Sequence, residues 1–441
     1  MTASRSVRSC AVVVALLCGA ALTAQVPAPS TNPRVTNAAQ PPVSPPSGAK
    51  SVLTRADFTY IGSFELPPVS RYTTGAVRGF AHRRVNGQLR FFANYQRDPA
   101  GDGYGTIEVV PPATLSTNPD TFPSATVVRQ WGVVGEGKAG GGSVHGLYWD
   151  EQDQRLYYSG GDTYTPESRF PSLGYVTLND STGAVTNRGP WFFTDRSAKM
   201  AMGGVVSIPA WWAQQFAPGR RLAACCGGYF SLATSGPISI GPALTAFDPS
   251  TLAALSAGAG IANRPLLGYP FNPNPYTDPQ RAQRDTDYRN DFDNWNPKDG
   301  KGYWTWTDWL AQGGTWIDTP TKSGVVFFPT MSNGRTWYER STLNAERYSH
   351  SWFVYAPSDL GLVASGKRQE WQIQPVSFWS VVYPGMASNL GGWSDYPDRM
   401  VAGSTYDETT RTLYVCVKFG RSNRNWPTPN PALVHAYRVA G

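Results

Sequence analysis

The sequence predicts an all-β fold, and two observations carry that prediction. Aromatic residues make up 13% of the 441 residues, and 45 glycines and 37 prolines interrupt the chain without any sustained helical apolar period. A short apolar run that closes on a turn signal recurs five times, beginning at Ile107, Tyr175, Leu244, Trp352 and Val434. These intervals are too long for hairpins and too irregular for a solenoid, but they suit a β-propeller with loops of variable length.

Each repeat predicts a blade of four strands. A second run precedes each closing run, beginning at Leu89, Arg155, Arg221, Gly324 and Thr412. A run rich in small residues comes before that, at Arg78, Val144, Gly203, Thr315 and Met400. We place this run innermost, because backbones approach closely near a propeller axis. Fourth, outer strands are predicted at Val127, Arg188, Arg264 and Glu370.

The fifth repeat lacks an outer strand, because the chain ends at Gly441. The alternating segment DFTYIGSFELP from Asp57 has no repeat of its own. An unpaired outer edge favours aggregation, so we expect this N-terminal strand to complete the last blade and close the ring. The prediction is therefore a five-bladed propeller. Residues 270–314 leave room for a further blade, so six or seven blades stay open.

The first 50 residues predict export rather than fold. Arg5 and Arg8, an apolar stretch and small residues ending at Ala24 indicate a signal peptide over residues 1–24. A lipoprotein signal at Cys18 is the alternative. Residues 25–50 form a Pro-rich disordered linker, and residues 51–441 form the propeller domain. We expect a secreted or periplasmic monomer with no transmembrane segment after cleavage.

Cysteines and charge limit the class of ligand. The leader contains Cys10 and Cys18, which leaves Cys225, Cys226 and Cys416. This is no disulfide framework; the adjacent pair is either a vicinal disulfide or two packed thiols. The net charge is +7 and most basic residues are arginines. An acidic glycan is admissible as a ligand, although a solvated basic surface explains the same charge. No basic run supports a nucleic-acid partner.

The long connections, which follow the second and outer strands, open on one face of a propeller and are the predicted functional surface. Acids on it could catalyse glycoside hydrolysis or only cap turns, and the sequence selects no pair among them. They are Asp98, Asp102, Asp162, Glu167, Glu339, Glu346, Asp395 and Asp398. We single out Asp162, Glu339 and Asp395 as catalytic candidates.

Histidines offer a second chemistry. His145 or His350 could act as the base of polysaccharide β-elimination with Tyr164 or Tyr348 as the acid, or could be structural. Stacking on sugar rings is predicted for Trp337 and Trp393, with core packing as the alternative. Anionic groups on a ligand would meet Arg97, Arg196 and Arg399.

An acidic segment offers the one candidate metal site. Asp285, Asp287, Asp291 and Asp293 lie close together and could bind calcium through hard oxygen ligands. The segment lacks the EF-hand glycine, since Asn290 stands at the sixth position. A solvated turn loop is the alternative, and we predict no other cofactor.

DFTYIGSFELP from Asp57 and WFVYAPSDLGLVASGKRQEWQIQP from Trp352 resemble segments of uncharacterised secreted bacterial β-propeller proteins. The resemblance implies the architecture and carries over no catalytic residue. Two functions remain. One is an exported module that binds a polysaccharide or a cell-surface protein. The other is a carbohydrate-active enzyme, either a glycoside hydrolase or a polysaccharide lyase.

Overall fold

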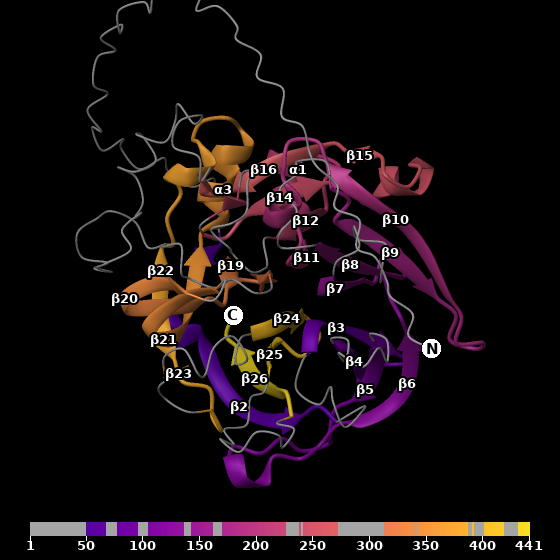
Figure 1. The fold of residues 1–441 in the computed structure, drawn as a ribbon, viewed down its shortest axis with the longest axis vertical. Helices are drawn as coiled ribbons and strands as arrows, with labels where there is room; N and C mark the ends of the chain where they lie inside the picture. The colour runs from indigo at the N-terminus through magenta and orange to yellow at the C-terminus, as the bar shows by residue number, and fades with distance from the viewer. Residues whose placement is uncertain are drawn as a thin grey trace, which may run out of the picture. The chain divides into compact units, whose positions relative to one another are not determined.

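The computed structural model describes residues 50–67, 77–95, 105–135, 143–161, 170–225, 238–239, 241–271, 313–339, 342–386, 390–391, 401–418 and 431–441. All of them belong to the compact unit of residues 48–441. Within this unit, five sheets surround a common axis as the blades of a β-propeller (Figure 1). The prediction of an all-β, five-bladed propeller is confirmed.

The blades follow the chain in order, each running from its innermost strand outward. Blade 1 contains β3 (Val77–Val85), β4 (Gln88–Tyr95), β5 (Gly105–Val110) and β6 (Thr126–Gly132). Blade 2 contains β7 (Ser143–Asp150), β8 (Arg155–Gly161), β9 (Leu173–Leu178) and β10 (Val185–Phe193), with β15 (Gly260–Ile261) added at its edge. Blade 3 contains β11 (Gly204–Ser207), β12 (Leu222–Cys225), β14 (Leu244–Phe247) and β16 (Asn263–Leu267).

Blades 4 and 5 complete the ring. Blade 4 contains β18 (Gly314–Asp318), β19 (Lys322–Phe327), β21 (Thr342–Tyr355) and β22 (Ser377–Val381). Strands β20 (Thr330–Glu339) and β23 (Leu390–Gly391) pair with the first part of β21. Blade 5 contains β24 (Val401–Asp407), β25 (Thr412–Val417), β26 (Leu433–Val439) and β2 (Phe58–Glu65).

The remaining elements are short. They are β1 (Ser51–Val52), β13 (Ile238–Ser239), β17 (Pro270–Phe271), helices α1 (Ala210–Phe216) and α3 (Pro357–Ala364), and the 3-10 turns Arg55–Asp57, Pro119–Thr121, Ala198–Met200, Pro249–Ala254 and Glu370–Gln372. In the part of the chain that the structure describes, no helix combines the length and apolarity needed to cross a bilayer.

The N-terminal strand closes the ring as predicted. β2 pairs antiparallel with β26, from Phe58 opposite Val439 to Glu65 opposite Leu433. The preceding residues attach to blade 4, because β1 pairs with β19 and Lys50 forms an ion pair with Asp318. One continuous segment therefore joins the last two blades without a disulfide.

The predicted outer strand of blade 4 at Glu370 is wrong. That segment begins with the 3-10 turn Glu370–Gln372, and the outer strand is β22. Trp371 and Ile373 are buried and pack into the core shared with blade 3. Their alternation, which suggested a strand, thus reflects packing against a neighbouring blade. Helix α3 precedes this segment and begins at Pro357, which suits a first helical position because it has no N–H to leave unpaired.

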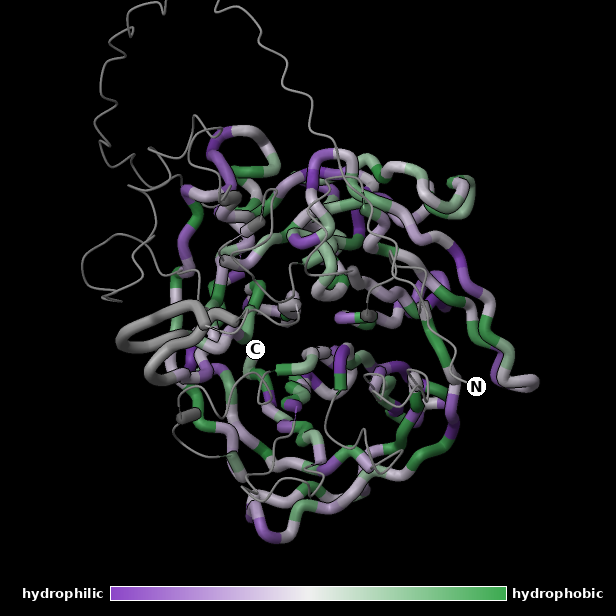
Figure 2. The backbone as a smooth tube through the Cα atoms, viewed as in Figure 1, coloured by the Kyte–Doolittle hydropathy of each residue, from purple (hydrophilic) through white to green (hydrophobic). Residues whose placement is uncertain are grey.

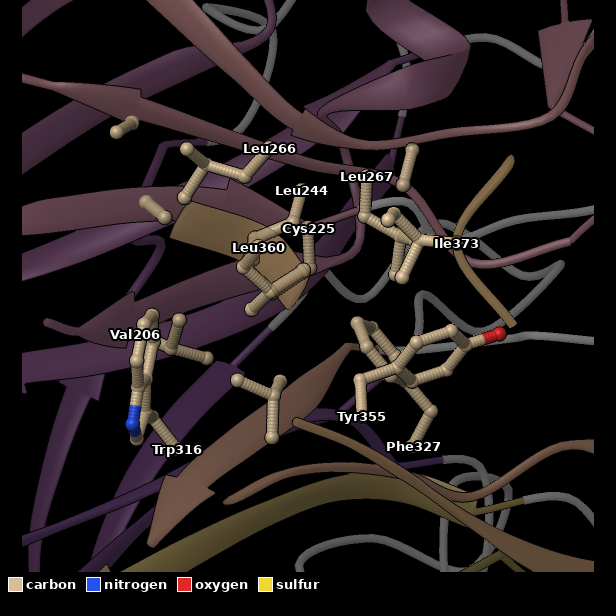
Figure 3. Close-up of a cluster of buried hydrophobic side chains, with 14 of the residues drawn as sticks. Val206, Cys225, Leu244, Leu266, Leu267, Trp316, Phe327, Tyr355, Leu360 and Ile373 are labelled. Carbon is tan, nitrogen blue, oxygen red and sulfur yellow. The ribbon is translucent and has the colours of Figure 1, made fainter. Parts of the chain in front are cut away.

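The hydrophobic core is divided into five clusters, one between each pair of adjacent blades. Successive side chains of a strand point to opposite faces, so each strand supplies two clusters. Ala223 and Cys225 of β12 face blade 4, whereas Leu222 and Ala224 face blade 2. Figure 3 shows the cluster between blades 3 and 4, and Figure 2 shows hydrophobic stretches in sheets all around the ring.

Glycines let the innermost strands meet near the axis. A Cβ on Gly146 of β7 would lie 2.3 Å from the Cα of Gly204 on β11. A Cβ on Gly403 of β24 would lie 2.9 Å from the backbone nitrogen of Phe80 on β3. These separations are too short for any side chain, which confirms that the runs rich in small residues are innermost.

Candidate functional site

The inner strands begin at the end of the ring where the long connections lie, and most candidate residues fall in connections outside the described residues. These are Asp162, Asp395, Tyr164, Trp393, Arg97 and Arg399, together with Asp285, Asp287, Asp291 and Asp293. Trp337 and Glu339 lie on β20, where their backbones pair with Asn344 and Thr342. The roles predicted for all of these residues stay predictions.

At this end, His145 projects from a β-bulge that recurs in the ring. Val144 and Gly146 of β7 lie opposite Gly160 and Ser159 of β8, so His145 is the extra residue. β3 has an equivalent irregularity between Val77 and Phe80, and β24 has one between Val401 and Gly403. A bulge redirects the side chain it carries. Three consecutive blades therefore redirect a residue at the beginning of their inner strands.

Arg78 occupies the position of His145 in the neighbouring blade. It precedes Gly79 as His145 precedes Gly146, and a Cβ on Gly79 would lie 3.1 Å from the carbonyl carbon of Gly146. Arg78 is partly exposed, whereas His145 is 5% exposed. The ring thus brings an arginine and a histidine from adjacent inner strands to the same end of the axis.

Lys418 adds a second cation at this end. It follows the last residue of β25, Val417, which pairs with Val401 at the beginning of β24. β24 lies beside β3, as the contact of Gly403 with Phe80 requires. Blades 5, 1 and 2 therefore supply Lys418, Arg78 and His145, which we name the axial cluster.

The hydrogen bond of His145 fixes its tautomer. Its Nε2 lies 3.1 Å from the carbonyl oxygen of Gly161 at the end of β8. A carbonyl oxygen only accepts, so Nε2 carries the proton and Nδ1 is left as an acceptor. Burial, and then the charges of Arg78 and Lys418, lower the pKa of His145 to about 3. The imidazole is therefore neutral at neutral pH, beside two cations.

The opposite ends of the inner strands carry acids that are already paired. Asp150, Asp318 and Asp407 are the last residues of β7, β18 and β24. Each forms an ion pair with a basic residue of another segment. The nitrogen to oxygen distances are 2.7 Å from Arg221 to Asp150, 2.6 Å from Lys50 to Asp318 and 2.6 Å from Arg84 to Asp407. Burial opposes ionisation of Asp407, but hydrogen bonds from Arg84 and Thr410 outweigh it and lower its pKa. We interpret these acids as structural, because each is matched by a cation: Asp150 and Asp407 across blades, and Asp318 by Lys50 of the segment attached to blade 4.

Arg196 joins two connections of the propeller through an ion pair with Glu370. It lies between β10 and β11 and is buried, and its guanidinium forms a two-pronged pair with Glu370. The Nη1 to Oε1 distance is 2.9 Å. This pair joins the connection between blades 2 and 3 to the segment inserted before β22. Its role in ligand binding stays a prediction.

The second predicted base lies in a separate buried cluster. His350 of β21 packs edge-on against Tyr383, and His435 of β26 stacks on the same ring at 4.9 Å between centroids. The Nδ1 of His435 lies 2.7 Å from the Oγ of Ser63. Tyr348, the acid proposed for His350, is buried in the core between blades 4 and 5.

Among the described residues, neither the cysteines nor any group of possible metal ligands forms a further site. Cys225 and Cys416 are buried free thiols, and burial raises the pKa of Cys225 to about 12. Cys226, the other half of the adjacent pair, falls outside the described residues. No group of three or more His, Cys, Asp or Glu side chains in the described ranges is arranged to hold a metal ion.

Sequence reasoning found His145 but missed Arg78 and Lys418. The sequence did contain a signal for Arg78: it stands one residue before Gly79, as His145 stands one residue before Gly146 in the next repeat. Lys418 had no comparable signal, because its nearness to the other two depends on the closed ring.

No protein-family model matches the chain, and no curated protein sequence matches it. Among solved structures, the chain is similar to a GH43_1 enzyme from Xanthomonas citri complexed with xylose. The TM-score is 0.40 and the identity 8%, and the match covers 85% of this chain and 90% of that chain. A GH43 β-xylosidase/α-arabinofuranosidase from a compost metagenome has a TM-score of 0.40 and 9% identity, and the match covers 86% of this chain and 95% of that chain. A DUF4221 protein from Bacteroides vulgatus has a TM-score of 0.33 at 9% identity, over 87% and 98%. The chemistry of the site must therefore be argued from its own residues.

Proposed function

We propose that this propeller is an exported binding module that recognises an anionic glycan at the end of the axis where its inner strands begin. The single observation that carries the proposal is the axial cluster, in which two cations from different blades lie beside a neutral histidine. Guanidinium and ammonium groups are the usual protein partners of carboxylate and sulfate groups. The aromatic and basic residues predicted in the surrounding connections would extend the contact along the chain of sugars.

Binding is favoured over catalysis by the low basicity of His145. A catalytic base works best when its pKa lies near the operating pH. A histidine whose pKa is about 3 takes up a proton poorly at neutral pH, but it still accepts a hydrogen bond. The acids that the structure describes at the other end of the inner strands are held in ion pairs. We therefore place the enzyme second.

The test is a binding assay with the full-length protein, immobilised polygalacturonate, dextran sulfate and neutral dextran. We expect binding to both anionic polymers and none to dextran. Replacing Arg78 or Lys418 by Met should weaken binding by about tenfold each, corresponding to about 1.4 kcal/mol for one charge-assisted hydrogen bond. Affinity should also fall between low and physiological salt, since exposed charge pairs are screened.

Arg438 provides a matched control. It is exposed on β26 and pairs with Thr412 at the beginning of β25, away from Lys418 at the other end of that strand. Arg438→Met removes the same charge and should leave binding within about twofold. Equal loss in this variant, or equal binding of neutral dextran, would remove the axial cluster from the proposal. Release of oligosaccharides during incubation would instead establish the enzyme.

A further inference from the structure

We propose that the contact between blades 4 and 5 is an acid-sensitive switch, in which protonation of His435 displaces the ring of Tyr383 that covers it and opens this contact before the other blades unfold. The proposal concerns the scaffold and does not depend on what the protein binds. Three features of His435 carry it: complete burial, a missing hydrogen-bond acceptor and, among the described residues, the lack of a carboxylate that acts on it.

His435 is enclosed by segments from both blades. It lies on β26, is 0% exposed, and is directly opposite Ser63 of the closing strand β2. The ring of Tyr383, which follows β22 of blade 4, stacks on the imidazole with 4.9 Å between centroids and an interplanar angle of 24°. His350 of β21 contacts the same tyrosine ring edge-on, at 5.1 Å between centroids. Tyr383 therefore contacts one histidine from each blade.

Tyr383 is held in this position by a buried hydrogen bond. Its side chain is 1% exposed, and its hydroxyl accepts a hydrogen bond from Nε1 of Trp352 at 2.8 Å. Trp352 in turn packs edge-on against Tyr437 of β26, with 4.8 Å between ring centroids. Displacing Tyr383 breaks this hydrogen bond and disturbs the core between the two blades, so the closed arrangement is the stable one while His435 is neutral.

A protonated His435 lacks an acceptor for one of its two N–H groups. Its Nδ1 lies 2.7 Å from the Oγ of Ser63, which lies 2.8 Å from the hydroxyl of Tyr60. Its Nε2 is buried and has no hydrogen-bond partner in the part of the chain that the structure describes. The neutral ring has a single N–H, which Ser63 can accept, whereas imidazolium has two. Protonation thus leaves a buried donor unpaired, which is costly.

No opposite charge compensates for the proton. The titratable groups around the imidazole are His350 from β21, Tyr383 from the connection after β22, Tyr60 from β2, and Tyr437 from β26. None of them is negatively charged in acid. Burial, and then the charge of His350, lower the pKa of His435 to about 3. A cation–π contact of the imidazolium with Tyr383 offsets only part of the cost of removing the ion from water.

The sign of the response follows from this lowered pKa. In the open arrangement His435 is hydrated and has an ordinary pKa of about 6.5, so the open state takes up the proton first as the pH falls. Linkage to this one proton raises the ratio of open to closed molecules about 50-fold between pH 6.5 and 4.5. The same linkage has no effect above about pH 7.5.

Hydrogen exchange followed by mass spectrometry of the full-length protein locates the opening. Exchange rates are corrected for their intrinsic pH dependence and converted to opening populations. We expect peptides covering β26 and residues 382–386 to gain about 50-fold between pH 6.5 and 4.5. At pH 4.5 their opening population should exceed that of β12 and β14 in blade 3 by at least about tenfold, because blade 3 opens only when the whole domain unfolds.

Two matched variants connect the response to His435. His435→Asn keeps a partner for Ser63 but does not titrate, so it should remove the 50-fold gain. His82→Asn is the control, because burial lowers the pKa of His82 to about 4 and its Nδ1 lies 2.6 Å from the Oγ1 of Thr405 on β24. This variant should keep the gain in β26. Thermal melting at pH 7.5 checks that both variants are folded.

Equal opening populations of β26 and blade 3 at pH 4.5 would show that the domain unfolds as a whole, and the switch would be wrong. A gain in β26 that persists in folded His435→Asn would exclude His435 as its cause. If His435→Asn does not fold, the comparison of β26 with blade 3 in the parent protein still decides whether the contact opens first.

Discussion

The ion pair between Arg83 and Glu108 makes a quantitative prediction about what holds blades 1 and 2 together. The side chains are 3% and 0% exposed, and both nitrogen to oxygen distances in their two-pronged contact are 2.8 Å. Glu108 also accepts a hydrogen bond from Trp131 Nε1 at 3.0 Å. The guanidinium lies 5.2 Å from the ring centroid of Trp149 on blade 2 and donates to Asp180 on the same blade. Removing Arg83 therefore leaves a buried carboxylate without its main counter-ion.

We expect Arg83→Met to lower the free energy of unfolding by about 3–5 kcal/mol, which is typical of a buried pair that loses one partner. The double variant with Glu108→Gln should lose less than about 2 kcal/mol, because no carboxylate is then left buried and the amide oxygen of the glutamine can still accept the hydrogen bond from Trp131. Urea unfolding followed by tryptophan fluorescence measures both values, provided that the slope of the transition stays constant.

A partly exposed ion pair serves as the control. The side chains of Lys50 and Asp318 are 21% and 20% exposed, so Lys50→Met should cost no more than about 1 kcal/mol. The reasoning is refuted if the double variant is as unstable as Arg83→Met alone. That result would mean that the packing of the arginine, rather than the stranded charge, provides the stabilisation.

Two further predictions concern ring closure and stability in acid. Phe64 of β2 is fully buried in the core between blades 5 and 1, so Phe64→Ala should lower the free energy of unfolding in urea by about 3–5 kcal/mol. Thr59 lies on the exposed side of the same strand, so Thr59→Ala should lower it by less than about 0.5 kcal/mol. Equal effects of the two variants would contradict ring closure by β2. Burial lowers the pKa of His82 to about 4 and those of His145 and His435 to about 3, so the unfolded chain binds protons first as the pH falls below about 6.5. Stability should then decline by about 1.4 kcal/mol per pH unit for each histidine down to its folded pKa, and these groups should have no effect above about pH 7.5. His435→Asn, which keeps an acceptor for Ser63, should reduce this slope between pH 6 and 4; an unchanged slope would show that His435 does not contribute.

The repeat pattern was sufficient to predict the blades because each blade is a local unit. Its strands follow one another along the chain, and their alternation and turn residues are present in a few dozen neighbouring positions. The closing strand could also be predicted, because DFTYIGSFELP was left over and blade 5 lacked an edge. The outer strand of blade 4 could not, since Trp371 and Ile373 alternate as a strand would while packing on a different blade.

The candidate site, like the fold, was predicted only where neighbouring residues carry the signal. His145 was identified because histidine is scarce and this one precedes a glycine at the beginning of an inner strand. What makes it a candidate acceptor is the Gly161 carbonyl, which holds its proton, and the two cations beside it. None of these relations could be predicted from the residue itself.

The sequence by itself predicted the four-stranded blades, the innermost position of the glycine-rich runs and the use of the N-terminal strand for closure, whereas the count of five needed the structure to exclude a further blade among the described strands. Local periodicity and turn chemistry encode these features. Only the tertiary structure decided which charges meet. Arg78, His145 and Lys418 are brought together from three blades by closure of the ring, and the acids at the other end are paired across blades by the same closure. Electrostatic interactions depend on distance in space, and in a ring that distance is set by the close approach of inner strands far apart in the chain.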